Sequence, residues 1–381
     1  MNPCRAPWPI LLAVSLAFPP GCAGAKREGW LAWNDGDPGR AVAAWRPLAT
    51  AGDPDAQFLL GVAYDEGQGV LADPAEAARW YRLAADAGHA PAQTNLGILL
   101  VEGRGVPRDE AQAAQWFGRA AEQGYARAQT NRGVLFLAGR GVERDLEQGR
   151  TLLRLAAMQG DARAQKHLGS IYDEGLGVDE DDAQAAHWFA LAAAQGDAGA
   201  HARLGILRVG GTGVPRDDAA AREHFESAAR DGVPAAQFAL GFLHERGRGT
   251  QRDERAAAGW YRAAAEQGLP VARTRLARLL LEGRGVDRDD AEAARLLALA
   301  ADAGHAPAQH DLALLLAQGR GVARNHEQAA AWLRRAAEQG FGPAQEKLGR
   351  RHELGHGVER DERAALTGTR GVARERDESG R

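Results

Sequence analysis

Cysteine and serine are scarce in this chain of 381 residues. The two cysteines, Cys4 and Cys22, both lie within the first 22 residues, so the rest of the chain has no residue for a disulfide or a thiolate nucleophile. Only four serines occur, and none stands in an S-x-x-K or G-x-S-x-G motif. We therefore expect no enzyme that uses a nucleophile of these classes.

Long apolar runs and a surplus of one charge are also missing. After the N-terminal segment, no stretch approaches the ~18 consecutive apolar residues of a transmembrane helix. The 47 Lys and Arg residues nearly balance the 51 Asp and Glu residues, and the two signs are interspersed. A nucleic-acid-binding protein normally shows a concentrated basic stripe, so the sequence predicts no nucleic-acid partner.

The first 25 residues have the order of regions of a secretory signal. The apolar run Ile10–Phe18 is too short to span a bilayer, and two prolines and several small residues follow it. Cleavage of an A-x-A site after Ala25 would make Lys26 the new N-terminus. Alternatively, the segment 21–24 resembles a lipobox in which Cys22 is lipidated, although its two preceding prolines fit that motif poorly. The protein is expected to be extracytoplasmic: periplasmic, secreted, or held at the membrane only by a lipid anchor.

Glycine is the residue in excess, with 48 in the chain. Most glycines recur with a period of 36 residues, which is the mark of a repeat architecture. One series, in a Gly-Val-like loop, consists of Gly69, Gly105, Gly141, Gly177, Gly213, Gly249, Gly285, Gly321 and Gly357. A companion glycine precedes each of these by two residues, and a third series runs from Gly88 to Gly340 with the same interval.

Each repeat is predicted to form two antiparallel helices joined by short turns. In the first repeat Asp53 caps a helix, Pro54 takes the first helical position and Gly67 ends it. Asp73 begins a second helix in the same way, and Gly88 ends that helix. One such hairpin cannot cover its own apolar face, so it must stack on its neighbours. The sequence therefore predicts an all-α fold, a solenoid of stacked antiparallel helix pairs.

The periodicity also predicts boundaries along the chain. Before the array, the stretch from Asp37 to Gly52 aligns with a second helix alone, and after the array the pattern fades near Leu366. The expected parts are a signal peptide at 1–25, an N-terminal capping half-repeat at 26–52, eight repeats at 53–340, a partial ninth repeat at 341–366 and a disordered tail at 367–381.

The repeat resembles the Sel-one-like repeat, a relative of the tetratricopeptide repeat, in one register over roughly residues 53–366. In residues 89–124 the matching positions are Ala92-Gln93, Leu96-Gly97, Gly103-Arg104-Gly105-Val106, Trp116-Phe117, Ala120-Ala121 and Gly124. Two positions depart from the pattern in single repeats. The tryptophan becomes Leu152, His224 or Leu296, and the Leu-Gly glycine becomes Ala277 or Ala313.

The resemblance implies a right-handed α-solenoid that serves as an adaptor and gathers proteins into complexes. Exported bacterial members of the family are linked to envelope assembly, exopolysaccharide export and host interaction. We therefore expect an extracytoplasmic protein–protein interaction scaffold that supports assembly of a cell-envelope or secretion complex. It is expected to be no enzyme and to need no cofactor. The alternatives are a glycan- or peptidoglycan-binding module and a β-lactamase-like hydrolase. A cysteine-rich branch of the family is associated with β-lactam hydrolysis, but it carries a cysteine pair in each repeat that this chain lacks.

One motif matches the zinc-protease signature H-E-x-x-H, at residues 352–356. That chemistry needs both histidines on one helical face. His352 falls at the end of a predicted first helix, whereas Gly355 and His356 fall in the interhelical loop. We therefore expect no metal site here.

The variable column is the position two residues before the Leu-Gly glycine in each first helix. Along the array it reads Leu59, Asn95, Asn131, His167, Arg203, Ala239, Arg275, Asp311 and Lys347. The next position stays leucine in most repeats and is expected to be core. In related solenoids the first helices line the concave face, where extended partners dock. The candidate partner-binding residues are therefore Asn95, Asn131, His167, Arg203, Arg275 and Asp311, and the expected partner is a protein, a peptide or a glycan. A merely solvated face is the competing interpretation.

Overall fold

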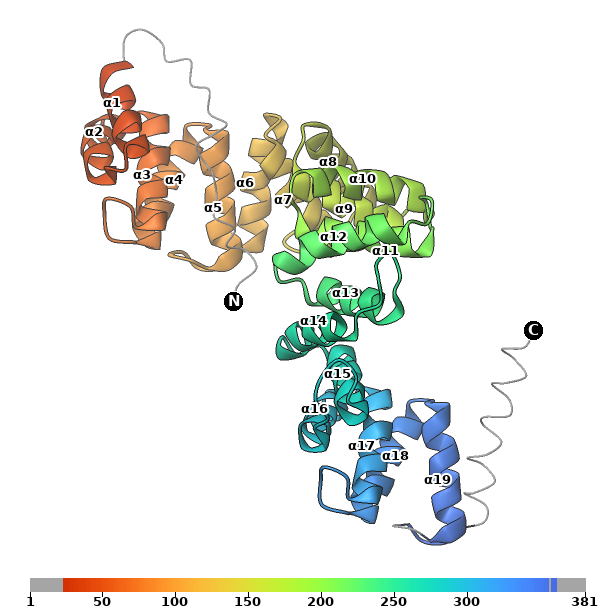
Figure 1. The fold of residues 1–381 in the computed structure, drawn as a ribbon. Helices are drawn as coiled ribbons and strands as arrows, with labels where there is room; N and C mark the ends of the chain where they lie inside the picture. The colour runs from red at the N-terminus through yellow and green to blue at the C-terminus, as the bar shows by residue number, and fades with distance from the viewer. Residues whose placement is uncertain (1–22, 356–357, 362–381) are drawn as a thin grey trace. The chain divides into compact units, whose positions relative to one another are not determined.

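The computed structural model describes residues 23–355 and 358–361, which form 19 α-helices and contain no strand (Figure 1). Consecutive helices pack in pairs, which confirms the predicted all-α solenoid class. The helices are α1 (Ala23–Asn34), α2 (Pro38–Thr50), α3 (Pro54–Glu66), α4 (Pro74–Asp86), α5 (Ala90–Glu102), α6 (Glu110–Glu122), α7 (Ala126–Ala138), α8 (Leu146–Met158), α9 (Ala162–Asp173), α10 (Asp182–Ala194), α11 (Ala198–Gly210), α12 (Asp218–Arg230), α13 (Pro234–Arg246), α14 (Glu254–Glu266), α15 (Pro270–Glu282), α16 (Asp290–Asp302), α17 (Ala306–Gln318), α18 (His326–Glu338) and α19 (Gly342–Leu354). From α3 onward, the odd-numbered helices are the first helices of the repeats and the even-numbered ones are the second helices. Within the described residues, no helix is long and apolar enough to cross a membrane.

Helix ends lie where the caps predict them. The Asp53 carboxylate accepts a hydrogen bond from the backbone N–H of Ala56, and α3 ends at Gly67, whose φ of 69° lies in the left-handed region. The Asp73 carboxylate caps α4 in the same way. These local signals fix the length of each helix before any packing is considered.

Packing inside a repeat depends on matched sizes at two positions. The backbone of Gly61 lies against the ring of Tyr81, and a Cβ at Gly61 would come within 2.5 Å of that ring. Gly97 meets Phe117 in the same way. Where the aromatic residue is replaced by Leu297, the glycine position holds Ala277, and both side chains are fully buried. An alanine on the first helix accompanies a leucine on the second in this repeat and in the next, at Ala313 and Leu333, whereas Gly133 faces Leu153.

Glutamine side chains hold one repeat to the next. Gln93 at the start of α5 donates through Nε2 to the carbonyl of Ala85 near the end of α4, at 3.0 Å, and this hydrogen bond is buried. Gln123 at the end of α6 then donates to Gln93 Oε1 at 2.9 Å. The same clamp recurs at Gln57, Gln129, Gln165, Gln237, Gln309 and Gln345. Each clamp adds a second hydrogen bond to a carbonyl near the helix end that already accepts one from the turn glycine, as Ala85 does from the Gly88 N–H at 3.0 Å.

The glycine loop of each repeat lies against the start of the preceding second helix. Gly285 has a φ of 66°, and a Cβ there would stand 2.2 Å from the carbonyl oxygen of Glu254, so no other residue fits without a shift. Arg284 beside it pairs with the Glu254 side chain at 2.7 Å. The pairs Arg140–Glu110, Arg248–Asp218 and Arg320–Asp290 repeat this contact.

The chain divides into two compact units. The first comprises the described residues up to Ile171 together with Leu176–Val178, and the second comprises Tyr172–Gly175 together with the described residues from Asp179 onward. In the first unit, Gly177 meets the side chain of Leu146 at 3.0 Å rather than a backbone carbonyl. Leu176 stands there in place of the loop arginine.

The N-terminal cap differs from the predicted half-repeat. Helix α1 packs on α2, so the cap is a helix pair, and α1 begins at Ala23, inside the predicted signal. Periodicity did not identify α1 because its sequence lacks the Ala-Gln and Leu-Gly steps. It still places Gly29 against the ring of Trp45, as α3 places Gly61 against Tyr81. Residues 1–22, including Cys22, and the predicted tail 367–381 lie outside the described residues.

Candidate interaction surface

The variable column lies on the first helices, beside core positions. The leucines that follow it in sequence, such as Leu60, Leu96 and Leu240, are fully buried. The column itself ranges from nearly buried at Asn95 to exposed at Arg203. The helical pattern therefore brings one side chain of each first helix to the edge of the core, where its identity is not fixed by packing.

In the first unit the column residues are bonded to the next repeat. Arg127, one repeat further along the chain, approaches Asn95 Oδ1 with its guanidinium at 3.4 Å. Arg163 makes the equivalent contact to Asn131 Oδ1, also at 3.4 Å. His167 is half-buried on α9. Asn95 and Asn131 therefore link neighbouring first helices.

In the second unit two column residues form ion pairs. Arg203 pairs with Asp173, and Arg278 donates through Nε to Asp311 Oδ2 at 2.7 Å. Burial raises the pKa of the Asp311 carboxyl, but hydrogen bonds from His310 and Arg278 outweigh it, and the pKa is lowered overall. Asp311 is therefore a charged link between α15 and α17.

Arg275 differs from the other five predicted residues. Its side chain is half-buried on α15, and no hydrogen bond or ion pair joins it to any residue that the structure describes. An arginine held at the edge of the core without an anionic partner can bind an anion supplied from outside.

Arg132 stands at the position after the variable column, where most repeats have a buried leucine. The structure shows how the arginine is accommodated there. Its guanidinium lies only 2.8 Å from the position that a Cβ on Gly118 would occupy. The same guanidinium stacks over the Phe136 ring at 5.6 Å and lies 3.8 Å from Glu122. Because Gly118 has no side chain, the Arg132 guanidinium fits against it, and Arg132 is packed into the repeat.

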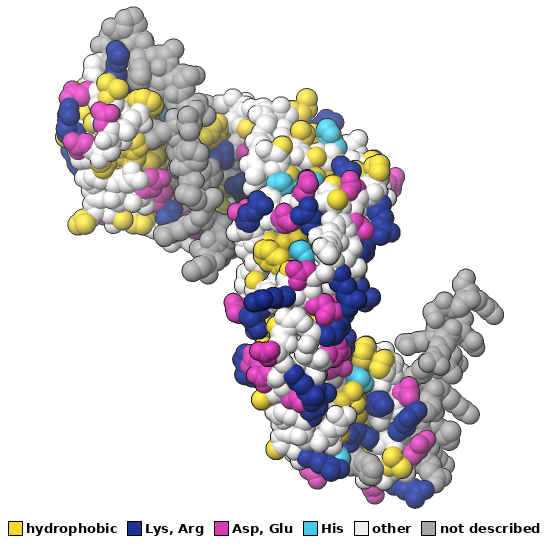
Figure 2. Space-filling view, in the orientation of Figure 1, with side chains coloured by type: hydrophobic (Ala, Val, Ile, Leu, Met, Phe, Trp, Pro, Cys, Tyr) yellow, Lys and Arg dark blue, Asp and Glu magenta, His cyan; other side chains and the backbone are white. Residues whose placement is uncertain are grey.

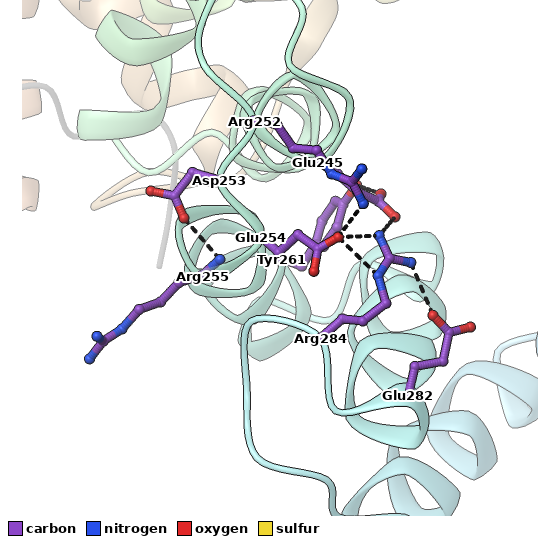
Figure 3. A network of polar contacts seen from close by, with 8 residues as sticks. All are labelled: Glu245, Arg252, Asp253, Glu254, Arg255, Tyr261, Glu282 and Arg284. Atoms are coloured by element: carbon purple, nitrogen blue, oxygen red, sulfur yellow. Dashed lines mark hydrogen bonds and ion pairs between the residues drawn. The ribbon is translucent and has the colours of Figure 1, made fainter.

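A buried polar network in the second unit was not predicted from the sequence (Figure 3). The Tyr261 hydroxyl donates to Glu245 Oε2 at 2.7 Å, and Arg284 lies 3.7 Å from the other oxygen of that carboxylate. Burial, together with the hydrogen bond to Glu245, raises the pKa of the Tyr261 hydroxyl, so it remains a donor. Five repeats earlier, Tyr81, Asp65 and Arg104 occupy the same positions, and Arg104 pairs with Asp65 at 3.0 Å. The signal in the sequence is a tyrosine 16 residues after an acid.

Two departures from the repeat meet in space. His201 stands where other repeats have the clamp glutamine, and His224 stands where they have tryptophan. Their Nδ1 atoms lie 3.1 Å apart. Burial and the neighbouring His201 lower the pKa of His224.

The zinc-protease motif lies at a helix end. Helix α19 stops at Leu354, and Gly355 follows in the left-handed conformation. His352 donates through Nδ1 to the carbonyl of Glu359 at 3.1 Å. His356 lies outside the described residues, among which no group of three or more His, Cys, Asp or Glu residues could hold a metal ion.

Stacked helix pairs with a variable polar column define an α-helical repeat protein. The chain belongs to the Sel1 repeat family, whose model matches nine consecutive windows: 54–89, 90–125, 126–161, 162–197, 198–233, 234–269, 270–305, 306–341 and 342–367. Proteins of this family are generally scaffolds that bind protein partners, and they are typically non-catalytic.

Two solved structures support the family and the fold. The chain is 32% identical to c5321, described as a protective antigen present in uropathogenic Escherichia coli strains and displaying an SLR fold, over 94% of this chain and 88% of that one, with a TM-score of 0.66. It is 30% identical to a Sel1 repeat protein from Oxalobacter formigenes, over 85% of this chain and 93% of that one, with a TM-score of 0.60. No curated protein sequence matches the chain.

Proposed function

We propose that the protein is an extracytoplasmic scaffold that binds a protein partner through its first helices and supports assembly of a cell-envelope or secretion complex. One observation carries this proposal. The variable column changes its chemistry from repeat to repeat, while the leucines beside it remain buried in the core. Such a face offers a different set of contacts at each repeat on a framework that the clamps and loops hold constant.

Two observations support export. The first 25 residues have the regions of a secretory signal, with a cleavage site after Ala25 or a lipidated Cys22. The similar protein c5321 is described as a protective antigen present in uropathogenic Escherichia coli strains. Both fit a protein that leaves the cytoplasm.

Burial of two tryptophans, Trp80 and Trp116, does not favour a glycan-binding function, although Trp188, Trp260 and Trp332 at the same position are half-buried. Trp80 and Trp116 are each only 7% exposed, and Arg79 and Arg119 lie over their rings at 5.3 and 4.5 Å. A sugar-binding platform needs an open aromatic face, so these rings serve packing instead.

A photo-crosslinking residue tests the proposed surface when it is placed on a first helix in one variant and on a second helix of the same unit in another. Position 275 on first helix α15 is compared with position 255 on second helix α14, an arginine that likewise has no ion pair but is exposed where Arg275 is half-buried. The full chain is expressed in a bacterial host that exports it, and crosslinks are resolved by mass. We expect a discrete protein adduct from position 275 and none from position 255. Equal yields at both positions, or none at either, would contradict the proposed surface.

Fractionation tests the location. The full chain should be recovered outside the cytoplasm, and recovery in the cytoplasm would overturn the extracytoplasmic part of the proposal. The Cys22→Ala variant separates the two signal interpretations, since it leaves the membrane fraction only if Cys22 carries the lipid.

A further inference from the structure

In the second unit, basic residues predominate on the first helices and acidic residues on the second helices, although the two signs are interspersed along the sequence. The first helices α11, α13, α15, α17 and α19 together carry nine Lys and Arg residues against five Asp and Glu residues. The second helices α12, α14, α16 and α18 carry seven Lys and Arg against ten Asp and Glu. The first-helix side of this unit is therefore basic in a chain whose net charge is −4.

Most acids on these first helices already have partners, whereas several cations do not. Glu245, Glu282, Asp311 and Glu346 all contact an arginine of the same unit. Arg246, Arg275 and Lys347 form no ion pair or side-chain hydrogen bond with any described residue. Arg246 lies 5.8 Å from the ring of Phe242, which leaves its charge available. The face thus presents positive charge without internal neutralisation.

Apolar side chains stand among these cations. Ile206 is 49% exposed, and Phe242 and Leu314 are half-buried at the equivalent positions of α13 and α17, three residues after the variable column. Figure 2 shows Lys and Arg side chains, interspersed with Asp and Glu, beside hydrophobic ones on the visible side of this unit. A uniformly charged polymer would use the cations but would leave the apolar side chains without partners.

We propose that the first-helix face of the second unit, with Arg246, Arg275 and Lys347 as its free cations, binds an extended acidic segment of a partner polypeptide that also carries apolar residues. This inference rests on the proposed scaffold function and names the chemistry of the partner. Charge complementarity selects the acidic segment, and Ile206 and Phe242 select a polypeptide over a phosphate backbone or an acidic polysaccharide.

The length of the segment follows from the spacing of the helices. Packed helices lie about 8–10 Å apart, and an extended chain advances about 3.3 Å per residue, so about three residues span one repeat. The three steps from α13 to α19 therefore take about nine residues, and a segment of about twelve covers them with residues to spare at its ends. The contrast within the chain is confined to α3 and α5, which carry four acids and no Lys or Arg, whereas α7 and α9 carry four Lys and Arg against one acid.

Fluorescence anisotropy with a labelled peptide tests the inference on the full chain. The probe is Glu-Leu-Ser repeated four times, and the comparison peptides are oligoglutamate and Lys-Leu-Ser of the same length. The triple variant Arg246→Glu, Arg275→Glu, Lys347→Glu is compared with Arg255→Glu, which makes the same change on α14. We expect the triple variant to weaken binding by about tenfold or more and Arg255→Glu by less than about twofold. Salt should also weaken binding, because exposed charges are screened.

Other outcomes overturn the inference. These are no binding of the acidic probe at low salt, an equal loss in Arg255→Glu, or oligoglutamate binding as tightly as the mixed peptide. Helix content by circular dichroism must be unchanged in each variant, and single variants replace the triple one if it is not. If position 275 crosslinks a protein that lacks an acidic segment, the scaffold proposal stands and this inference fails.

Discussion

The matched sizes at the glycine–aromatic contact predict that the effects of two substitutions on stability are strongly coupled. Gly97 on α5 faces Phe117 on α6, and a Cβ at Gly97 would stand 2.6 Å from the ring. Non-bonded carbons prefer about 3.5–4.0 Å, so the Gly97→Ala methyl must displace a side chain that is 2% exposed. The protein itself uses the alternative combination at Ala277 and Leu297.

The expected energies can be assembled from these contacts. Gly97→Ala gains about 1 kcal/mol of helix propensity but loses about 2–3 kcal/mol to overpacking, so it should destabilise by about 1–2 kcal/mol. Phe117→Leu alone should lose about 1–2 kcal/mol, because it removes buried volume. The double variant recreates the Ala–Leu combination, so it should lose less than about 1 kcal/mol. The coupling energy of the cycle is then about 2 kcal/mol, within the range found for residues in contact.

Hydrogen exchange is the suitable assay. A repeat array does not unfold in a single two-state step, so urea midpoints alone would average over repeats. Exchange of the α5 and α6 amides reports the local free energy of opening. The control is Gly259→Ala in α14, where no atom lies within 4 Å of the new Cβ, and it should stabilise by about 1 kcal/mol. If the two losses simply add in the double variant, to within about 0.3 kcal/mol, the size-matching argument is wrong.

Three further substitutions or conditions test other contacts. Tyr261→Phe deprives the buried Glu245 carboxylate of its 2.7 Å donor and should lower the local free energy of opening by about 1–3 kcal/mol, measured by hydrogen exchange of the α13 and α14 amides; unchanged exchange would contradict the network. Gln93→Met removes an inter-repeat clamp worth about 1 kcal/mol and should speed exchange of the amides around it, with distant repeats unaffected. The hydrogen bond from Arg248 holds the pKa of Asp218 at about 2, below its value of about 3.9 in an unfolded chain. That contact therefore adds stability above pH 4 that is lost as the pH falls towards 2, and hydrogen exchange of the α12 amides, followed against pH, should show a smaller acid loss of protection in Arg248→Ala; an equal loss would refute the assignment.

Sequence periodicity predicted the fold because each signal for it is local. A capping carboxylate such as Asp73 and a turn glycine such as Gly67 act on the residues beside them, so a 36-residue register reports every helix end. Helix α1 was not predicted because it shares no such signal. Its Gly29 is recognisable as a packing glycine only through its contact with Trp45. The capping pair therefore had to be seen in three dimensions.

The chemistry of the candidate surface was harder to predict for a geometric reason. First and second helices alternate along the chain, so charges that face opposite sides of the second unit are interleaved in sequence and appear balanced. Pairs such as Arg127 with Asn95 and Arg278 with Asp311 join residues about one repeat apart. Periodicity places such residues in columns, but only the structure shows which columns touch.

Departures from the repeat help to separate packing from function. Most of them occur as compensating pairs: His201 lies against His224, Arg132 fills the space above Gly118, and Ala277 accompanies Leu297. A change that its neighbour absorbs keeps the stack intact and needs no ligand to explain it. Arg275 has no such neighbour, although it stands at the edge of a core where an unpaired charge is unfavourable. A residue that the stack does not require and no internal partner neutralises is best explained by a partner outside the chain, which is why the test of binding is placed at position 275.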